Sequence, residues 1–146
     1  MKINLSVTDI THEDLVNILS TALETSYWAK CEYRVADYVD TDQDDYYEDI
    51  LAKILLAGKT VVINDTYAED ETDSHGNLNH YWDGEFELMS YEVSLNDIKA
   101  GITKCFASAD YSHAVTNLIE NDAINFDSRD ADSLLQMIVF GDVIYD

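Results

Sequence analysis

YEDILAKILLAGKTVVIN, residues 47–64, decides the fold class of this chain. Its apolar residues first recur every three or four positions, which is the period of a helix with one buried face. Gly58 then stands where a left-handed cap is expected to end the helix, and residues 59–64 are typical of a strand. A helix followed at once by a strand predicts a mixed architecture around one core. The helical residues expected to be buried are Tyr47, Ile50, Leu51, Ile54 and Leu55.

Helices are also expected on both sides of this unit. Thr11 opens a helix that ends near residues 26–28, Ser94 opens another, and Asp127 opens a last one that runs through Phe140 to Gly141. These side chains can accept hydrogen bonds from the free N–H groups of a first helical turn. Residues 111–121 are expected to add a short helix. The stripes expected to be buried are Leu95, Ile98, Ile102, Cys105 and Phe106 after Ser94, and Leu134, Leu135, Ile138 and Val139 after Asp127.

Strand patterns complete the predicted fold. Residues 3–7 alternate polar and apolar side chains, as a half-buried strand does. Residues 81–93 form a second strand region after the one at 59–64, so residues 59–93 are expected to be a hairpin with a long acidic tip. Residues 32–38 are compatible with extended structure. We therefore predict a single α+β domain over residues 1–146, with a small, mainly antiparallel sheet covered by four or five helices.

Composition restricts the classes of partner. The 146 residues are 47% hydrophobic and include ten Tyr, four Phe and two Trp, which argues against a disordered acidic tail. Thirty acidic residues against eight basic ones give a net charge of −22. Such a charge disfavours direct binding to nucleic acid or to anionic lipid, since both require basic groups. The start of the chain carries no secretory signal pattern and no apolar run is long enough for a membrane span, so we expect a cytoplasmic protein. Cys31 and Cys105 are then expected to be reduced.

No catalytic or metal-binding signature appears in the sequence. The run that begins at Asp40 resembles a calcium-binding loop, but Asp45 stands where glycine is needed and Leu51 where the bidentate acid is needed. His113 has no evident partner, and no serine or cysteine nucleophile lies in a known motif. A metal-dependent hydrolase around His75, His80 and Asp83 stays as an alternative. Otherwise we expect a non-enzymatic protein without cofactor or metal.

Acidic residues gather in two clusters that are flanked by aromatic doublets. We hypothesise that the acids imitate phosphate charges for a protein partner and that tyrosine and tryptophan rings add specific contacts. The first cluster consists of Asp37, Asp40, Asp42, Asp44, Asp45, Glu48 and Asp49, the second of Glu69, Asp70, Glu71 and Asp73, and the aromatic candidates are Tyr46, Tyr47, Tyr81 and Trp82.

The magnitude of the charge gives this hypothesis a scale. A compact chain of this length has a diameter of roughly 38 Å, and B-DNA of that length carries roughly 22 negative charges. The net charge of −22 therefore equals that of a DNA segment as long as the protein. A basic groove built for nucleic acid would attract such a molecule strongly at low salt.

Four segments resemble a group of small phage and prophage accessory proteins from gut-type bacteria. They are residues 21–28, 50–63, 91–101 and 130–142, which together cover roughly half of the chain. The chain departs from the group at Thr25 and Ser26, where glycines are frequent, and in a longer acidic insertion at residues 65–79. The resemblance implies no particular activity. It implies an accessory protein in the bacterial cytoplasm, and small acidic proteins of this kind resemble inhibitors of host defence, some of them DNA mimics.

The resulting hypothesis is a phage- or prophage-encoded inhibitor that binds a basic nucleic-acid-binding surface of a host complex, such as a CRISPR effector or a restriction enzyme. It would act as a monomer or a homodimer. One alternative is a protein that sequesters a nucleotide immune signal, with Lys30 and Arg34 as candidate basic residues. Another is an accessory protein whose acidic surface serves only solubility.

Overall fold

Capping residues set the start of three helices, as the sequence predicts. The computed structural model describes residues 10–38, 45–67, 81–82, 85–86 and 89–145. In it, α1 (His12–Thr25), α3 (Leu95–Ala107) and α5 (Ser128–Phe140) begin directly after Thr11, Ser94 and Asp127. Each cap side chain accepts the N–H of the aspartate three residues later, and that carboxylate accepts the N–H of the cap. These reciprocal bonds satisfy backbone donors that the first turn leaves unpaired.

The remaining helical elements are shorter. α2 (Tyr47–Leu56) is followed by Gly58 with φ of +81°, which confirms the predicted left-handed end of this helix. α4 (Ser112–Ile119) is the short helix expected at residues 111–121. Single 3-10 turns, η2 (Val35–Asp37) and η4 (Glu120–Ala123), follow β1 and α4. The segment 32–38 is thus extended only at its start.

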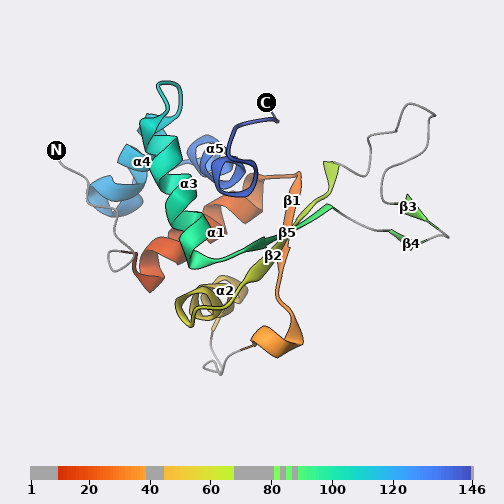
Figure 1. Cartoon of the computed structure of the whole chain (residues 1–146). Helices are drawn as coiled ribbons and strands as arrows, with labels where there is room; N and C mark the ends of the chain where they lie inside the picture. Colours follow the sequence, from red (N-terminus) through yellow and green to blue (C-terminus); the bar gives the residue numbers. More distant parts are fainter. Residues whose placement is uncertain (1–9, 39–44, 68–80, 83–84, 87–88, 146) are drawn as a thin grey trace, which may run out of the picture.

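Three antiparallel strands form the sheet in the order β1-β2-β5 (Figure 1). They are β1 (Ala29–Glu32), β2 (Val61–Asp65) and β5 (Met89–Val93), and β2 is buried along its whole length. Ile63 of β2 lies opposite Cys31 on one side and Tyr91 on the other. The pairing of β2 with β5 confirms the predicted hairpin, whereas its tip at residues 68–80 and the strand expected at residues 3–7 lie outside the described residues.

The strand region expected at residues 81–93 is divided. β3 (Tyr81–Trp82) and β4 (Glu85–Phe86) pair with each other in a separate two-stranded ladder, and only Met89–Val93 joins the main sheet. The prediction of one strand was therefore wrong in its extent, because β2 offers only five residues for pairing.

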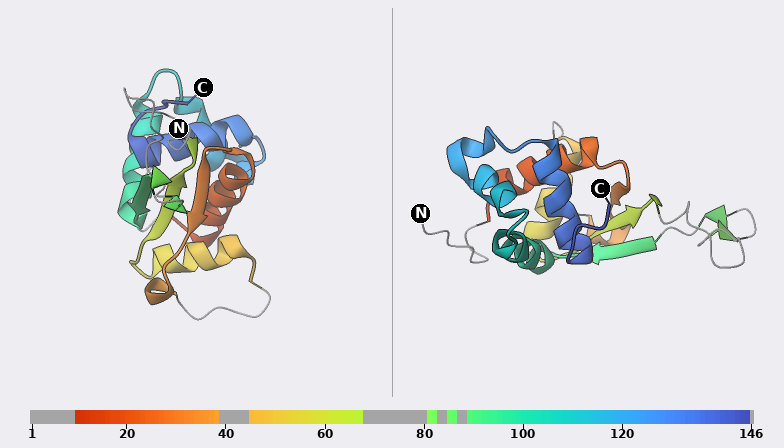
Figure 2. Two further views of the ribbon diagram at one scale, coloured as in Figure 1. Left: turned by 90° about the vertical axis from the view of Figure 1, so that its right-hand side faces the viewer. Right: turned by 90° about the horizontal axis from the view of Figure 1, so that it is seen from above.

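The helices pack together on one side of the sheet. α5 contacts α1, α3 and α4, and its Ala131, Leu134 and Leu135 are buried in the centre of the core. α2 packs on α1 and on β2 and lies below the other helices in the view of Figure 1. Figure 2 shows β2 and β5 extending away from the helical layer when the molecule is seen from above. In the described part of the chain, five α-helices and this sheet make up a small α+β domain, as predicted.

A partly buried hydrogen-bond network joins the corner between α1 and β1 to the C-terminal residues. Asp132 Oδ1 accepts from Ser26 Oγ and from Trp28 Nε1, both at 2.7 Å. Its Oδ2 accepts from Gln136 Nε2 at 2.9 Å. The fully buried Gln136 amide also donates to the Tyr145 carbonyl and accepts from the N–H groups of Ile144 and Tyr145. One helix thus fixes the turn between α1 and β1 together with the last described residues.

Aromatic rings extend this network to the sheet. The Phe140 ring lies 4.9 Å from Trp28 and 5.3 Å from Tyr91 of β5, between ring centroids. Tyr145 Oη donates to Asp65 Oδ2 at 2.6 Å, where β2 ends. The chain end, the helical layer and the sheet are therefore held by the same group of side chains.

Two residues predicted to be buried are exposed. Tyr47 is 42% exposed because it is the first residue of α2 and its ring lies beside Tyr33 at the edge of the sheet. Phe106 is 40% exposed because it lies in the last turn of α3, at the border of the face formed by Ile98, Ile102 and Cys105.

Gly101 provides a test of the packing between α3 and α5. A Cβ at this position would lie 2.6 Å from the Ile138 Cα and 2.9 Å from its backbone N, so the two helices would have to separate. At an open helical site, Gly→Ala stabilises by about 1 kcal/mol. We predict that Gly101→Ala instead lowers the free energy of unfolding in urea by about 1–3 kcal/mol. A more stable variant would contradict the close contact.

Candidate functional site

The structure describes part of the predicted partner-binding residues. Six of them lie between η2 and the first turn of α2: Asp37, Asp45, Tyr46, Tyr47, Glu48 and Asp49. Tyr81 and Trp82 form β3, of which only the backbone is described. The others lie outside the described residues: Asp40, Asp42, Asp44, Glu69, Asp70, Glu71 and Asp73.

Acids of the first cluster have structural partners. Asp45 Oδ2, just before α2, lies 2.6 Å from Nζ of Lys53, which is in the last turn of that helix. Asp49 accepts the Tyr46 N–H at 3.0 Å and lies 2.9 Å from His12 Nε2. Asp37 lies 3.9 Å from the Arg34 guanidinium. These carboxylates fix the start of α2 and η2, a role that the sequence-based hypothesis did not assign to them.

Tyrosines cover the same region. The Tyr33 ring lies 5.8 Å from Tyr38 and 6.0 Å from Tyr47, between centroids. Tyr46, at the N-cap of α2, is 77% exposed. Tyr47 Oη donates to the backbone carbonyl of Cys31 at 2.8 Å, so this side chain joins α2 to the outer edge of β1. The predicted aromatic contact residues Tyr46 and Tyr47 are thus both accessible beside acidic residues.

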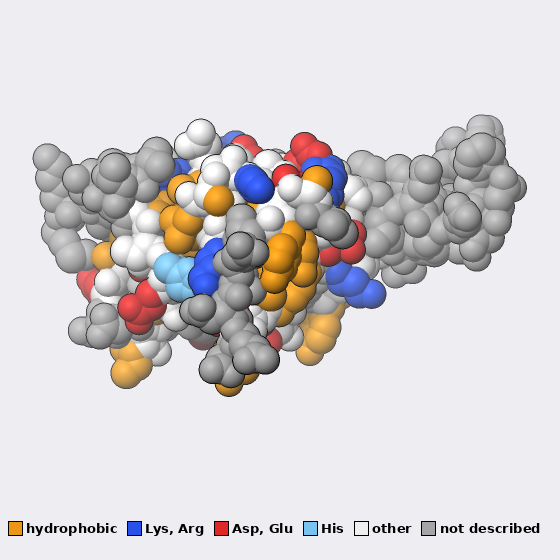
Figure 3. Space-filling view, turned by 90° about the horizontal axis from the view of Figure 1, so that it is seen from below, with side chains coloured by type: hydrophobic (Ala, Val, Ile, Leu, Met, Phe, Trp, Pro, Cys, Tyr) orange, Lys and Arg blue, Asp and Glu red, His pale blue; other side chains and the backbone are white. Residues whose placement is uncertain are grey.

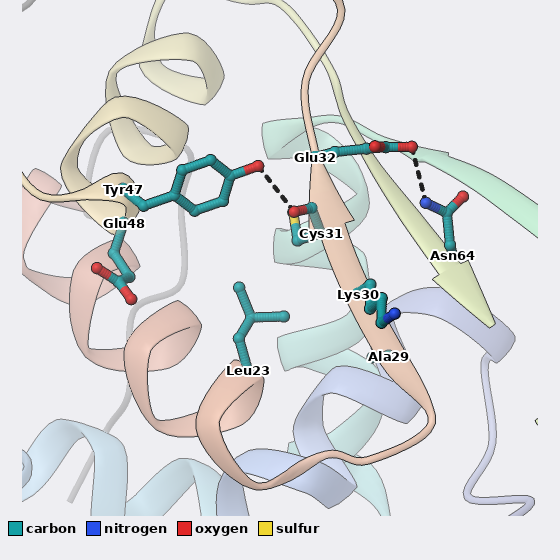
Figure 4. A pocket seen from close by; sticks show the side chains of 8 residues that line it. All are labelled: Leu23, Ala29, Lys30, Cys31, Glu32, Tyr47, Glu48 and Asn64. Atoms are coloured by element: carbon teal, nitrogen blue, oxygen red, sulfur yellow. Dashed lines mark hydrogen bonds between the residues drawn. The ribbon is translucent and has the colours of Figure 1, made fainter. Parts of the chain in front are cut away.

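An open cleft of about 480 Å³ lies next to this region, between α1, α2 and β1 (Figure 4). All four residues of β1 line it on one side, and Leu23 of α1 points into it from the other. The full lining consists of Leu23, Ala29, Lys30, Cys31, Glu32, Tyr47, Glu48 and Asn64.

The cleft carries more negative than positive groups. Its charged residues are Glu32, Glu48 and Lys30. Asn64 Nδ2 donates to Glu32 Oε1 at 2.8 Å and holds that carboxylate in place. Arg34 contacts Glu92 and Asp37, so the two basic residues considered for a nucleotide do not meet in a base-lined cavity. The lining favours a cationic ligand over an anionic one.

The thiol and phenol of this cleft are neutral at physiological pH. Burial raises the pKa of Cys31 to about 12, and the neighbouring Glu32 adds to the shift. Burial likewise raises the pKa of Tyr47 to about 12, with Cys31 contributing next. A cysteine acts as a nucleophile through its thiolate, which a raised pKa suppresses. The raised pKa therefore disfavours Cys31 as a nucleophile at neutral pH.

The surface around α2 mixes residue types. Figure 3 shows the molecule from below, the side on which α2 lies. Hydrophobic side chains gather in the middle of this face, and acidic and basic side chains surround them. The charges of the described residues visible on this face are of both signs and do not form one continuous acidic stripe.

Other candidates have structural explanations within the described residues. His113 does have a partner, contrary to expectation: its Nε2 lies 3.2 Å from Oδ1 of the buried Asp130 on α5. The sequence could not show this because the contact joins two helices. Among the described residues, no group of three His, Cys, Asp or Glu side chains is placed to hold a metal ion. His75, His80 and Asp83 lie outside them.

None of the helices in the described part of the chain combines the length and the apolar character needed to cross a membrane.

Comparison with known proteins finds no matching family model, no matching curated protein and no matching solved structure. The proposals below rest on the geometry and the charge of this chain and, for the kind of target, on the resemblance given in the sequence analysis.

Sequence reasoning did not identify five of the cleft residues as part of a site: Leu23, Ala29, Cys31, Glu32 and Asn64. Leu23 fits the apolar stripe of α1, while Glu32 and Asn64 carry no motif. Glu32 and Asn64 come together through the pairing of β1 with β2, in which Glu32 lies opposite Val62 and Lys30 opposite Asn64. A strand assignment for residues 29–32 would have been the signal that led to them.

The thiol of Cys31 offers a test of this site. Because burial raises the pKa of Cys31 to about 12, the thiolate fraction at pH 8 falls roughly a thousandfold below that of an ordinary cysteine. We predict that iodoacetamide alkylates Cys31 in the folded protein at least roughly a hundredfold more slowly than in urea, as followed by peptide mass spectrometry. Equal rates in the two states would contradict the described environment.

Proposed function

We propose that this protein is a non-enzymatic inhibitor that binds a basic, nucleic-acid-binding surface of another protein. A CRISPR effector or a restriction enzyme of a bacterial host is the expected kind of target, as the resemblance to phage accessory proteins implies. The observation that carries the proposal is the net charge of −22 on a chain that folds around an apolar core. A folded, highly acidic domain presents its charge on a surface of defined shape, which a disordered acidic tail does not.

Exposed tyrosines support a protein partner. Tyr27 is 81% exposed at the turn before β1, and Tyr46 is 77% exposed at the start of α2. Tyrosine side chains supply a large, rigid contact area and are frequent at the energetic centres of protein interfaces. Acidic residues around such rings add charge complementarity toward arginine and lysine. The described surface thus offers both attraction at long range and specific contact area.

The acids are expected to contribute unequally. Asp45 and Asp49 already interact with Lys53 and His12, so a partner would gain less from contacting them directly. Glu48 lies at the cleft and is better placed for direct contact. The whole net charge nevertheless steers the approach of a basic partner, because that field depends on the sum of the charges. Association should therefore be fast at low salt and weaken as salt is added.

Binding at rising salt tests the proposal. We predict that the protein binds a purified DNA-binding defence complex, excludes DNA from it, and loses at least about tenfold in affinity between roughly 50 and 200 mM salt. The triple variant Asp40→Asn, Asp42→Asn and Asp44→Asn removes three charges from the first cluster and should weaken binding about tenfold or more. Fluorescence anisotropy with labelled DNA as the competitor measures both effects.

A matched control removes the same amount of charge elsewhere. Glu13→Gln, Glu24→Gln and Asp110→Asn alter three exposed acids outside the first cluster and should change binding only slightly. If both triple variants weaken binding equally, the first cluster is not a contact surface. Absence of binding to any DNA-binding complex would leave solubility as the role of the charge and would refute the proposal.

A further inference from the structure

We propose that the cleft beside β1 is a docking site for an extended basic peptide segment, which adds to the sheet as a strand on the outer side of β1. The inference deepens the proposed function and rests on it, because it states how a basic partner is held. It follows from the position of β1, the shape of the cleft and the charges that line it.

β1 lies at the edge of the sheet. Within the described residues it pairs with β2 alone. The Cys31 carbonyl accepts a hydrogen bond from Tyr47, so it points away from β2 and toward the cleft. In an antiparallel strand, the N–H and C=O of one residue point the same way. The N–H of Cys31 therefore faces the outer edge beside its carbonyl, which Tyr47 occupies. An edge of this kind is a template for another strand once the carbonyl is released.

The cleft matches a short extended peptide in size. Its volume of about 480 Å³ lies within the range of typical ligand sites. The four residues of β1 span roughly 13 Å, which is the length of four residues of an added strand. In Figure 4, Leu23 and Tyr47 lie across the cleft from β1, and the Tyr47 hydroxyl reaches the Cys31 carbonyl.

The two faces of β1 favour a peptide in which apolar and basic residues alternate. Ala29 and Cys31 point to one face of β1, together with Leu23 and Tyr47 of the helices. Lys30 and Glu32 alternate with them and face the other way, as successive strand residues do. An added strand would meet an apolar side and a polar, acidic side at every second residue. Apolar and basic residues in alternation fit this arrangement.

The charges that line the cleft favour a cationic ligand. Glu32 and Glu48 outnumber Lys30 in the lining, and the Asn64 amide fixes Glu32 at 2.8 Å. The surrounding protein has a net charge of −22, so an anionic or neutral segment gains no comparable attraction. The occupant is therefore a strand of a basic protein.

Tyr47 controls access to the edge. Its hydroxyl occupies the Cys31 carbonyl, which an N–H of the incoming strand would use. Tyr47→Phe removes this internal competitor and keeps the ring. We predict that this variant binds the peptide roughly fivefold more tightly, the change expected for one hydrogen bond of ordinary net strength. A role of Tyr47 as a direct hydrogen-bonding contact to the peptide would give the opposite sign.

The probe for the test is an acetylated peptide of alternating arginine and valine, titrated into the full-length protein by calorimetry. Glu32→Gln with Glu48→Gln should weaken binding roughly fivefold or more, and the exposed control Glu24→Gln should have little effect. Methylation of alternate backbone nitrogens of the peptide distinguishes strand pairing from plain charge attraction. In one register it should abolish binding, and in the other it should leave binding unchanged.

The outcomes separate this inference from the proposed function. A shift of the Cys31 amide resonance on peptide binding, together with dependence on the methylation register, would support strand addition. Equal binding of both methylated peptides, or no effect of the two Glu→Gln changes, would overturn it. If a defence complex still binds in a salt-dependent way while the Cys31 amide stays unperturbed, the proposed function stands and the docking site is refuted.

Discussion

The carboxylate of Asp132 is the contact on which the arrangement of the chain depends. It accepts hydrogen bonds from Ser26, Trp28 and Gln136, and therefore joins the corner between α1 and β1 to the central helix α5. Asp132 is half-buried, and these donors replace the hydration that its carboxylate loses on folding. Gln136 continues the same network to the last residues of the described chain. One half-buried carboxylate thus links the start of the first strand to α5.

The candidate site follows from that anchor. β1 starts directly after Trp28, so the line of its outer edge is fixed at one end by the buried indole. Tyr47 fixes the other end through the Cys31 carbonyl, and Asp49 orients the first turn of α2 that carries Tyr47. The cleft lies between α1, α2 and β1, and the contacts of Asp132, Asp49 and Tyr47 fix the positions of these elements.

The predictable parts of the structure are those determined locally. Thr11, Ser94 and Asp127 each act on the three residues that follow them, so their helices could be predicted from spacing alone. Gly58 likewise ends its helix through its own backbone conformation. The cleft could not be predicted, because Glu32 and Asn64 meet only after β1 pairs with β2. The same holds for the internal partners of Asp45 and Asp49, which the sequence shows only as members of an acidic run.

The contacts of Asp132 hold the corner between α1 and β1 rigid, so that the cleft exists before any partner arrives. Hydrogen exchange at the Trp28 indole N–H and the Ala29 amide, followed by NMR, tests it most directly, since these protons are bonded to Asp132 and to the Ser26 carbonyl. If both exchange as slowly as the core amides of α5, the corner opens only when the whole domain unfolds. Exchange of either proton by local opening, orders of magnitude faster than in α5, would contradict the account.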